Sequence, residues 1–168
     1  MKLRTDMTIN GKLHKKGTEI SWKLVYPFFL FHMLGFGASG FFLAYSDSAD
    51  SVFFLYLHGG FAILVYLIFY LALFGVDEVK WMFINGALGL LGISAQIDWI
   101  LALFGKHVRD YSVIVHVIPF LYYILYTFLI HQMVLDITGA RDDEVKKKQV
   151  DRAYVGLSIA IYGVLLLT

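Results

Sequence analysis

The chain contains no cysteine among its 168 residues and only two prolines. The lack of cysteine excludes disulfide bonds, thiolate metal ligands and any chemistry that depends on thiol exchange. Charged residues are also scarce, at 16% of the chain. They are concentrated in the first 23 residues and in the connections between long apolar stretches, so charge divides the sequence into segments.

What the chain has in abundance is apolar side chains: 59% of its residues are hydrophobic, 17% are aromatic, and the mean hydropathy is +0.69. A soluble domain has roughly 45–50% apolar residues. The sequence therefore predicts an integral membrane protein. A membrane-spanning helix needs about 20 mainly apolar residues. We expect an all-α bundle of four full transmembrane helices and a shorter C-terminal fifth helix, at about 24–45, 52–76, 81–104, 111–136 and 142–168.

The first 23 residues are polar and basic, and we expect them to form a solvated cytoplasmic leader before a single transmembrane unit at 24–168. The first apolar segment is too long for a cleaved signal peptide, and no small-residue cleavage site follows it, so it should be retained. The first connection has Asp47 and Asp50 but no basic residue. Of the 14 lysines and arginines, only Lys106 and Arg109 then fall outside, which predicts a cytoplasmic N-terminus in the cell (inner) membrane.

The fourth apolar segment carries two histidines, His116 and His131, separated by fifteen residues. At about 100° and 1.5 Å per residue, both lie on one stripe of the helix and roughly 22 Å apart along it. Depth in the bundle predicts a partner for each: His58 for His116 near the outer end, and His32 for His131 in the inner half. The stripe between them carries Phe120, Tyr123 and Thr127.

Two facing imidazoles are the axial ligands that a six-coordinate b-type haem needs. Gly59 and Gly60, next to His58, would leave room for the porphyrin edge, and Arg109 could meet a propionate. On this interpretation the protein is an electron-transfer subunit with haem b as its cofactor. The likeness is architectural, because the sequence carries no family motif.

A second interpretation places His58, His116 and Asp98 in one transition-metal site at the outer end. No i, i+4 pair of ligands supports it, so the site depends on tertiary proximity. The third interpretation uses the same three residues in a small proton or ion channel or transporter. Against transport stands the lack of an inverted repeat.

A single histidine inside a membrane protein is more often a hydrogen-bonded interior residue than a ligand. A non-catalytic structural or assembly subunit of a membrane complex therefore remains an alternative, and the sequence leaves open whether the protein is an enzyme. Expected partners are the lipid bilayer and either other membrane subunits or further copies of the chain. Nucleic acid is not expected as a partner.

Overall fold

The computed structural model describes residues 1–9, 11–46 and 51–167, and helices dominate this part of the chain, so the all-α prediction is confirmed. The helical elements follow one another along the chain. In chain order they are α1 (Trp22–Ala44), α2 (Ser51–Phe54), the π-helical turn η1 (Leu55–Gly60), α3 (Phe61–Phe74), α4 (Val76–Leu88), α5 (Leu90–Ala102), the 3₁₀ turn η2 (Val108–Asp110), α6 (Val113–Ile137) and α7 (Glu144–Leu167).

Three helical segments are long and apolar enough to cross a membrane: α1, the continuous stretch Ser51–Phe74 and α6, with 23, 24 and 25 residues. The pair α4 and α5 gives a fourth span if it counts as one, although it is bent by 68°. Within the described chain, α7 does not meet the same criterion, because its first half is charged. The prediction of a helical membrane protein is therefore confirmed, whereas four unbroken spans are not found.

The third apolar segment was expected to form a single helix over 81–104, and this expectation is wrong. The helix begins earlier, at Val76, and breaks at Gly89. Glycine lowers helix stability and leaves space for a neighbouring side chain. Gly86 and Gly92 flank the break.

The glycines around the break accommodate side chains from two other helices. A Cβ on Gly86 would lie 2.4 Å from Cδ1 of Ile124 in α6, and a Cβ on Gly92 would overlap the hydroxyl of Tyr162 in α7. That hydroxyl donates a hydrogen bond to the carbonyl of Gly89 at 3.2 Å. The bend is therefore a packed feature, because α6 and α7 fill the space that the glycines leave.

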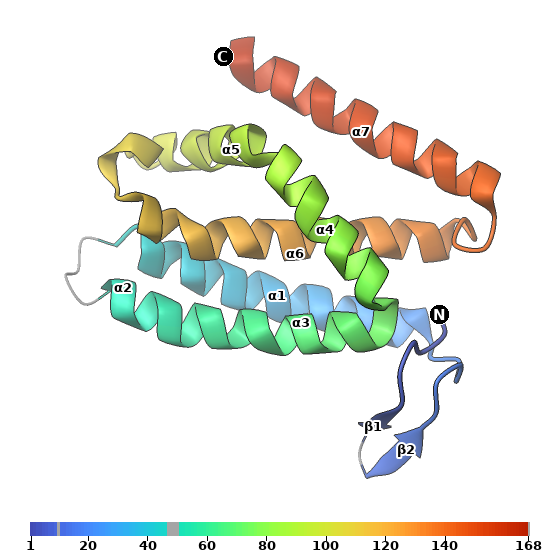
Figure 1. Ribbon diagram of the computed structural model, residues 1–168. Helices are drawn as coiled ribbons and strands as arrows, with labels where there is room; N and C mark the ends of the chain where they lie inside the picture. The colour runs from blue at the N-terminus through green and yellow to red at the C-terminus, as the bar shows by residue number, and fades with distance from the viewer. Residues whose placement is uncertain (10, 47–50, 168) are drawn as a thin grey trace.

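Figure 1 shows how the helices are arranged: α1, α3 and α6 run alongside one another, α4 crosses α6 obliquely, and α7 lies outermost. Helix α7 packs mainly against α5 and α6. The N-terminal hairpin projects from the end of the bundle where α1 begins. We refer to that end as the Trp22 end, and to the opposite end, where α1 finishes, as the Tyr45 end.

The leader is more ordered than a solvated tail. Strands β1 (Met7–Ile9) and β2 (Lys12–His14) pair in an antiparallel hairpin whose turn includes Gly11 at φ +74°. Its neighbour Asn10 lies outside the described residues. Leu3 is only 2% exposed, and the N–H of Arg4 donates to the carbonyl of Ala72 at 3.0 Å. The leader is thus attached to the end of α3.

The start of α7 is capped by Asp143. Its carboxylate accepts hydrogen bonds from the backbone N–H groups of Lys146 at 3.1 Å and Val145 at 3.0 Å. These bonds, the one from Lys146 first, lower the pKa of Asp143 below its ordinary value because they stabilise the ionised form. The helix therefore begins at the rim of the bundle with its first N–H groups satisfied.

Candidate functional site

His116 is fully occupied by contacts within the protein. Its Nε2 lies 3.1 Å from the carbonyl of Val108, and its Nδ1 lies 2.9 Å from the hydroxyl of Tyr45. A carbonyl can only accept, so Nε2 carries the proton and Tyr45 donates to Nδ1. Neither ring nitrogen of this neutral tautomer is left to bind a metal or haem iron.

Asp98 also contacts Val108: it binds the backbone N–H of this residue, whereas His116 binds the carbonyl. One carboxylate oxygen accepts the N–H of Val108 at 2.7 Å, while the other lies 3.5 Å from Nδ1 of His107. Asp98 and His116 are thus brought together through the backbone of Val108, as parts of the packing between η2, α5 and α6. Arg109, in the same turn, is exposed.

His58 lies away from His116 and Asp98 and contacts α1 instead. Its Nε2 lies 3.2 Å from the hydroxyl of Ser39 in α1, and its ring packs against Phe36 with ring centroids 5.1 Å apart. Among the described residues, no group of three or more His, Asp or Glu side chains is placed to hold a metal ion. The predicted metal set of His58, Asp98 and His116 is therefore not assembled, because equal depth does not make side chains point the same way.

The predicted inner pair is separated in the same manner. Nε2 of His131 lies 2.9 Å from a carboxylate oxygen of Asp151 in α7, and its ring contacts Tyr154. Nδ1 of His32 lies 2.8 Å from the carbonyl of Phe28, one turn back on α1. A bis-histidine haem held by His58 with His116, or by His32 with His131, does not fit these contacts.

Gly59 and Gly60 were expected to leave room for a porphyrin edge. Instead α6 fills the space at Gly59, where a Cβ would lie 2.6 Å from Cγ2 of Ile118. At Gly60 the nearest side-chain atom would be 4.0 Å away. Gly59 therefore allows close packing of η1 against α6. Close packing is the commoner role of glycine in membrane helices.

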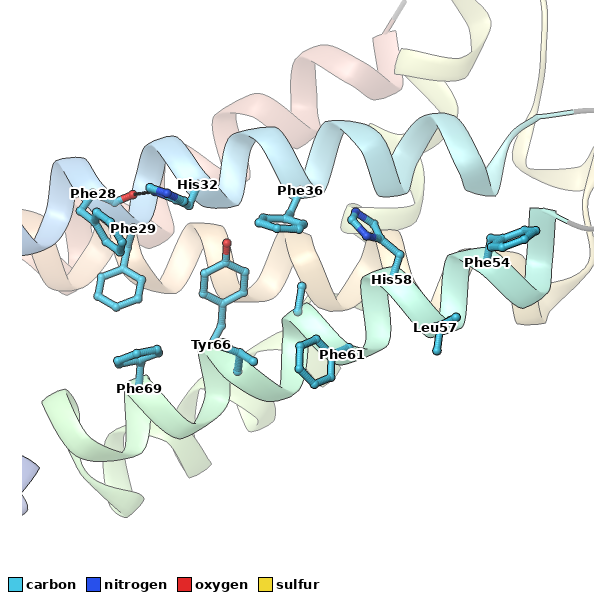
Figure 2. A pocket seen from close by; sticks show the side chains of 12 residues that line it. Phe28, Phe29, His32, Phe36, Phe54, Leu57, His58, Phe61, Tyr66 and Phe69 are labelled. Atoms are coloured by element: carbon cyan, nitrogen blue, oxygen red, sulfur yellow. Dashed lines mark hydrogen bonds between the residues drawn. The ribbon is translucent and has the colours of Figure 1, made fainter. Parts of the chain in front are cut away.

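The structure pairs the histidines differently: His32 and His58 line one groove between α1 and the η1–α3 segment (Figure 2). The groove has a volume of about 720 Å³. None of the described side chains that line it is charged. Aromatic rings form most of its wall, from Phe28, Phe29, Phe36, Phe54, Phe61, Tyr66 and Phe69.

Tyr122 of α6 is 5% exposed. Cβ atoms on Gly37 and Gly40 would lie 3.6 and 3.5 Å from its ring, so the ring fits against the small-residue face of α1. Its ring centroid is 6.4 Å from that of Tyr66, which lines the groove. In the described part of the chain, its hydroxyl is the one buried side-chain polar atom without a hydrogen-bond partner.

The stripe of α6 between its two histidines faces α5 and α7. The hydroxyl of Tyr123 donates to the side-chain oxygen of Gln96, and that of Tyr154 lies 3.5 Å from the carbonyl of Thr127. Each of these hydroxyls has an acceptor within the protein. Hydrogen bonds between helices explain the polar stripe without a ligand.

Sequence reasoning missed a buried network at the Trp22 end. The guanidinium of Arg141 pairs with Asp136 and also donates to the side-chain oxygen of Gln132 at 2.8 Å and the hydroxyl of Tyr26 at 3.2 Å. Burial, the largest single effect, would lower the pKa of Arg141, but Asp136, Tyr26 and Glu78 together outweigh it and hold that pKa above its ordinary value. The network joins α1, α6 and the α6–α7 connection, and nothing in the sequence marks Tyr26 as its partner.

These elements define a helical membrane protein with three to four candidate spans and an aromatic groove between α1 and the η1–α3 segment. No protein-family model matches the chain, and comparisons with curated proteins and with solved structures gave no match.

Proposed function

We propose that this membrane protein binds a lipid-soluble ring molecule of the quinone class in the groove between α1 and α3. The observation that carries the proposal is that His32 and His58, both exposed and both within spans, line the same aromatic groove. His32 is ten residues into the 23-residue α1, about 15 Å along its axis. Polar side chains at that depth usually face a partner, because contact with hydrocarbon is costly.

The lining favours a flat, uncharged ligand. A groove of about 720 Å³ lies within the usual range for small-molecule sites. Faces and edges of aromatic rings pack well against another ring, and two imidazoles can orient its polar atoms. At its margin, Leu57 and Phe61 are 60% and 69% exposed, so an isoprenoid tail could leave the groove directly into lipid.

Haem b in this groove is the less favoured alternative. His58 contacts Ser39, which lies seven residues beyond His32 on α1, so the two imidazoles sit at levels about 10 Å apart. Two axial nitrogens on one iron would need to be roughly 4 Å apart. In this proposal a bound quinone, and not haem, is therefore the group that would carry electrons. The cytoplasmic N-terminus and the inner membrane remain part of the proposal, supported by the distribution of basic residues.

The test is ligand content after purification. Membranes containing the protein are supplied with a short-tailed benzoquinone together with its hydroquinone, and the protein is purified in mild detergent. Bound ligand in both redox forms is then extracted and quantified together as total quinone. We expect near-stoichiometric quinone in the wild type and a decrease of about tenfold or more in His58→Phe, which removes one orienting group. His131→Gln is the matched control, because His131 contacts Asp151 away from the groove.

Equal quinone in the wild type and in His58→Phe, or no quinone in either, would contradict the proposal. An absorption spectrum of the same sample, air-oxidised and then reduced, distinguishes the haem alternative by a Soret band. A stable complex with a second protein that shields the groove and excludes quinone would instead indicate a subunit interface.

A further inference from the structure

We infer that the groove prefers the reduced, dihydroxy form of its ring ligand over the oxidised, dicarbonyl form. This inference rests on the proposed function and concerns the same site. It follows from which nitrogen of each imidazole carries the hydrogen. A hydrogen-bond partner inside the protein fixes that position for both histidines.

In His32 the assignment depends on a backbone carbonyl. Nδ1 lies 2.8 Å from the carbonyl oxygen of Phe28. That oxygen only accepts hydrogen bonds, so Nδ1 must carry the hydrogen and donate it. In the neutral imidazole, Nε2 then has a lone pair and no hydrogen, and it makes no hydrogen bond with the described residues.

In His58 the assignment depends on Ser39. The serine hydroxyl donates its single hydrogen to the carbonyl of Phe36 at 2.9 Å. Nε2 of His58, 3.2 Å from the same hydroxyl oxygen, must therefore be the donor in that contact. Nδ1 of His58 is left with a bare lone pair. Both histidines that line the groove thus offer it an acceptor.

Two acceptors suit a ligand with two hydroxyl groups. The two imidazoles lie about 10 Å apart along α1. In a 1,4-dihydroxy ring the opposite oxygens are about 5.5 Å apart, and each O–H···N hydrogen bond adds about 2.8 Å. The ligand with its two hydrogen bonds therefore spans about the distance between the imidazoles. Phe36 lies between His32 and His58 along α1, and its ring lines the groove (Figure 2).

A dicarbonyl ring of the same shape has only acceptors, so it would place oxygen lone pairs against nitrogen lone pairs. To bind equally well it would need His32 to give up its bond to the carbonyl of Phe28. It would also need the hydroxyl of Ser39 to leave the carbonyl of Phe36 and donate to Nε2 of His58 instead. Among the other described residues that line the groove, Tyr66 has a hydroxyl that can both donate and accept, and none is charged. Discrimination between the two forms therefore falls to His32 and His58.

The experiment compares three ligands that share one ring and one short tail: the 1,4-hydroquinone, its quinone and its 1,4-dimethyl ether. Binding to the wild type in lipid nanodiscs is measured by calorimetry at neutral pH without oxygen. We expect the hydroquinone to bind at least about tenfold more tightly than either of the other two. The dimethyl ether separates the effect of the hydroxyl hydrogens from that of ring shape.

Ser39→Ala tests the positioning role of the serine without altering a ring-contacting residue. Without that hydroxyl, His58 is free to take the other tautomer, so the variant should bind the quinone more tightly than the wild type does and lose part of the preference. Equal affinity of the wild type for all three ligands would overturn the inference while leaving the proposed function intact. Failure of all three to bind would overturn the proposed function itself.

Discussion

Gly59 and Gly60 are neighbours in η1 but face different surroundings. A Cβ on Gly59 would come within 2.6 Å of the branched side chain of Ile118, which is 2% exposed, whereas a Cβ on Gly60 would have 4.0 Å of clearance. Gly59→Ala should therefore destabilise the protein by about 1–3 kcal/mol through overpacking. Gly60→Ala should have little effect. Thermal unfolding of both variants in one detergent checks the difference, and equal midpoints would contradict the close packing of η1 on α6.

The histidines show how far the sequence predicts a site. Hydropathy and residue counting gave the depth of each histidine, but the direction around the helix axis was not determined. His58 lies in the π-helical turn η1, where the number of residues per turn differs from that of an α-helix, so counting misplaces its side chain. The ring nitrogens of His116 form hydrogen bonds with Tyr45 and Val108, which are 71 and 8 residues away in sequence.

The orphan hydroxyl of Tyr122 could not be predicted for a related reason. Its neighbours Gly37 and Gly40 receive the ring of Tyr122 in the structure. Which aromatic side chain would fill that face depends on the rotation of α6 against α1. Small residues in a sequence can mark a face suited to close packing, but they do not identify the side chain that packs there.

At the scale of elements, the break between α4 and α5 is the main departure from the predicted fold. Gly86, Gly89 and Gly92 are spaced three residues apart. This spacing is compatible with a straight, closely packed helix and also with a broken helix. Hydropathy alone predicts one long span, because it depends on residue composition and contains no information about a bend in the helix. Tertiary contacts decide the outcome, because Tyr162 of α7 bonds to the carbonyl of Gly89 at the bend.

This explanation predicts coupling between Gly92 and Tyr162. The Cβ in Gly92→Ala would overlap the tyrosine hydroxyl, so Tyr162 must leave and its hydrogen bond to Gly89 is lost. Gly92→Ala and Tyr162→Ala should each lower the unfolding midpoint, and the double variant should be no less stable than Tyr162→Ala alone. Gly163→Ala is the control, since nothing lies within 4 Å of its added Cβ. Additive losses in the double variant would show that α7 does not depend on the bend.

On the scale of the whole molecule, the class of protein was predictable while the connections between distant segments were not. Apolar segments of sufficient length gave the membrane class and most helix positions to within a few residues. The contact between Arg141 and Tyr26 joins residues 115 positions apart, and the leader bonds to Ala72 near the end of α3. Such contacts depend on how helices are arranged around one another, which a single sequence does not specify.

The path of the chain through the membrane can be tested directly, because these 168 residues include no cysteine and single cysteines can be introduced without background labelling. Asp77, at the start of α4, and Arg109, beyond α5, are both exposed. If α4 and α5 form one bent span and the N-terminus is cytoplasmic, Asp77→Cys lies inside and Arg109→Cys outside. A membrane-impermeant maleimide should then label Arg109→Cys in intact spheroplasts, and Asp77→Cys only after permeabilisation.

The two assumptions fail in different ways. A re-entrant α4–α5 pair would place both cysteines on the same side, so both would be labelled under the same condition. An inverted orientation would keep them on opposite sides and exchange the two results. The fully cysteine-free parent should show no labelling in either condition. Opposite accessibility in the expected sense requires four crossings before α7, and this places the basic leader and the Arg141 network on the cytoplasmic side.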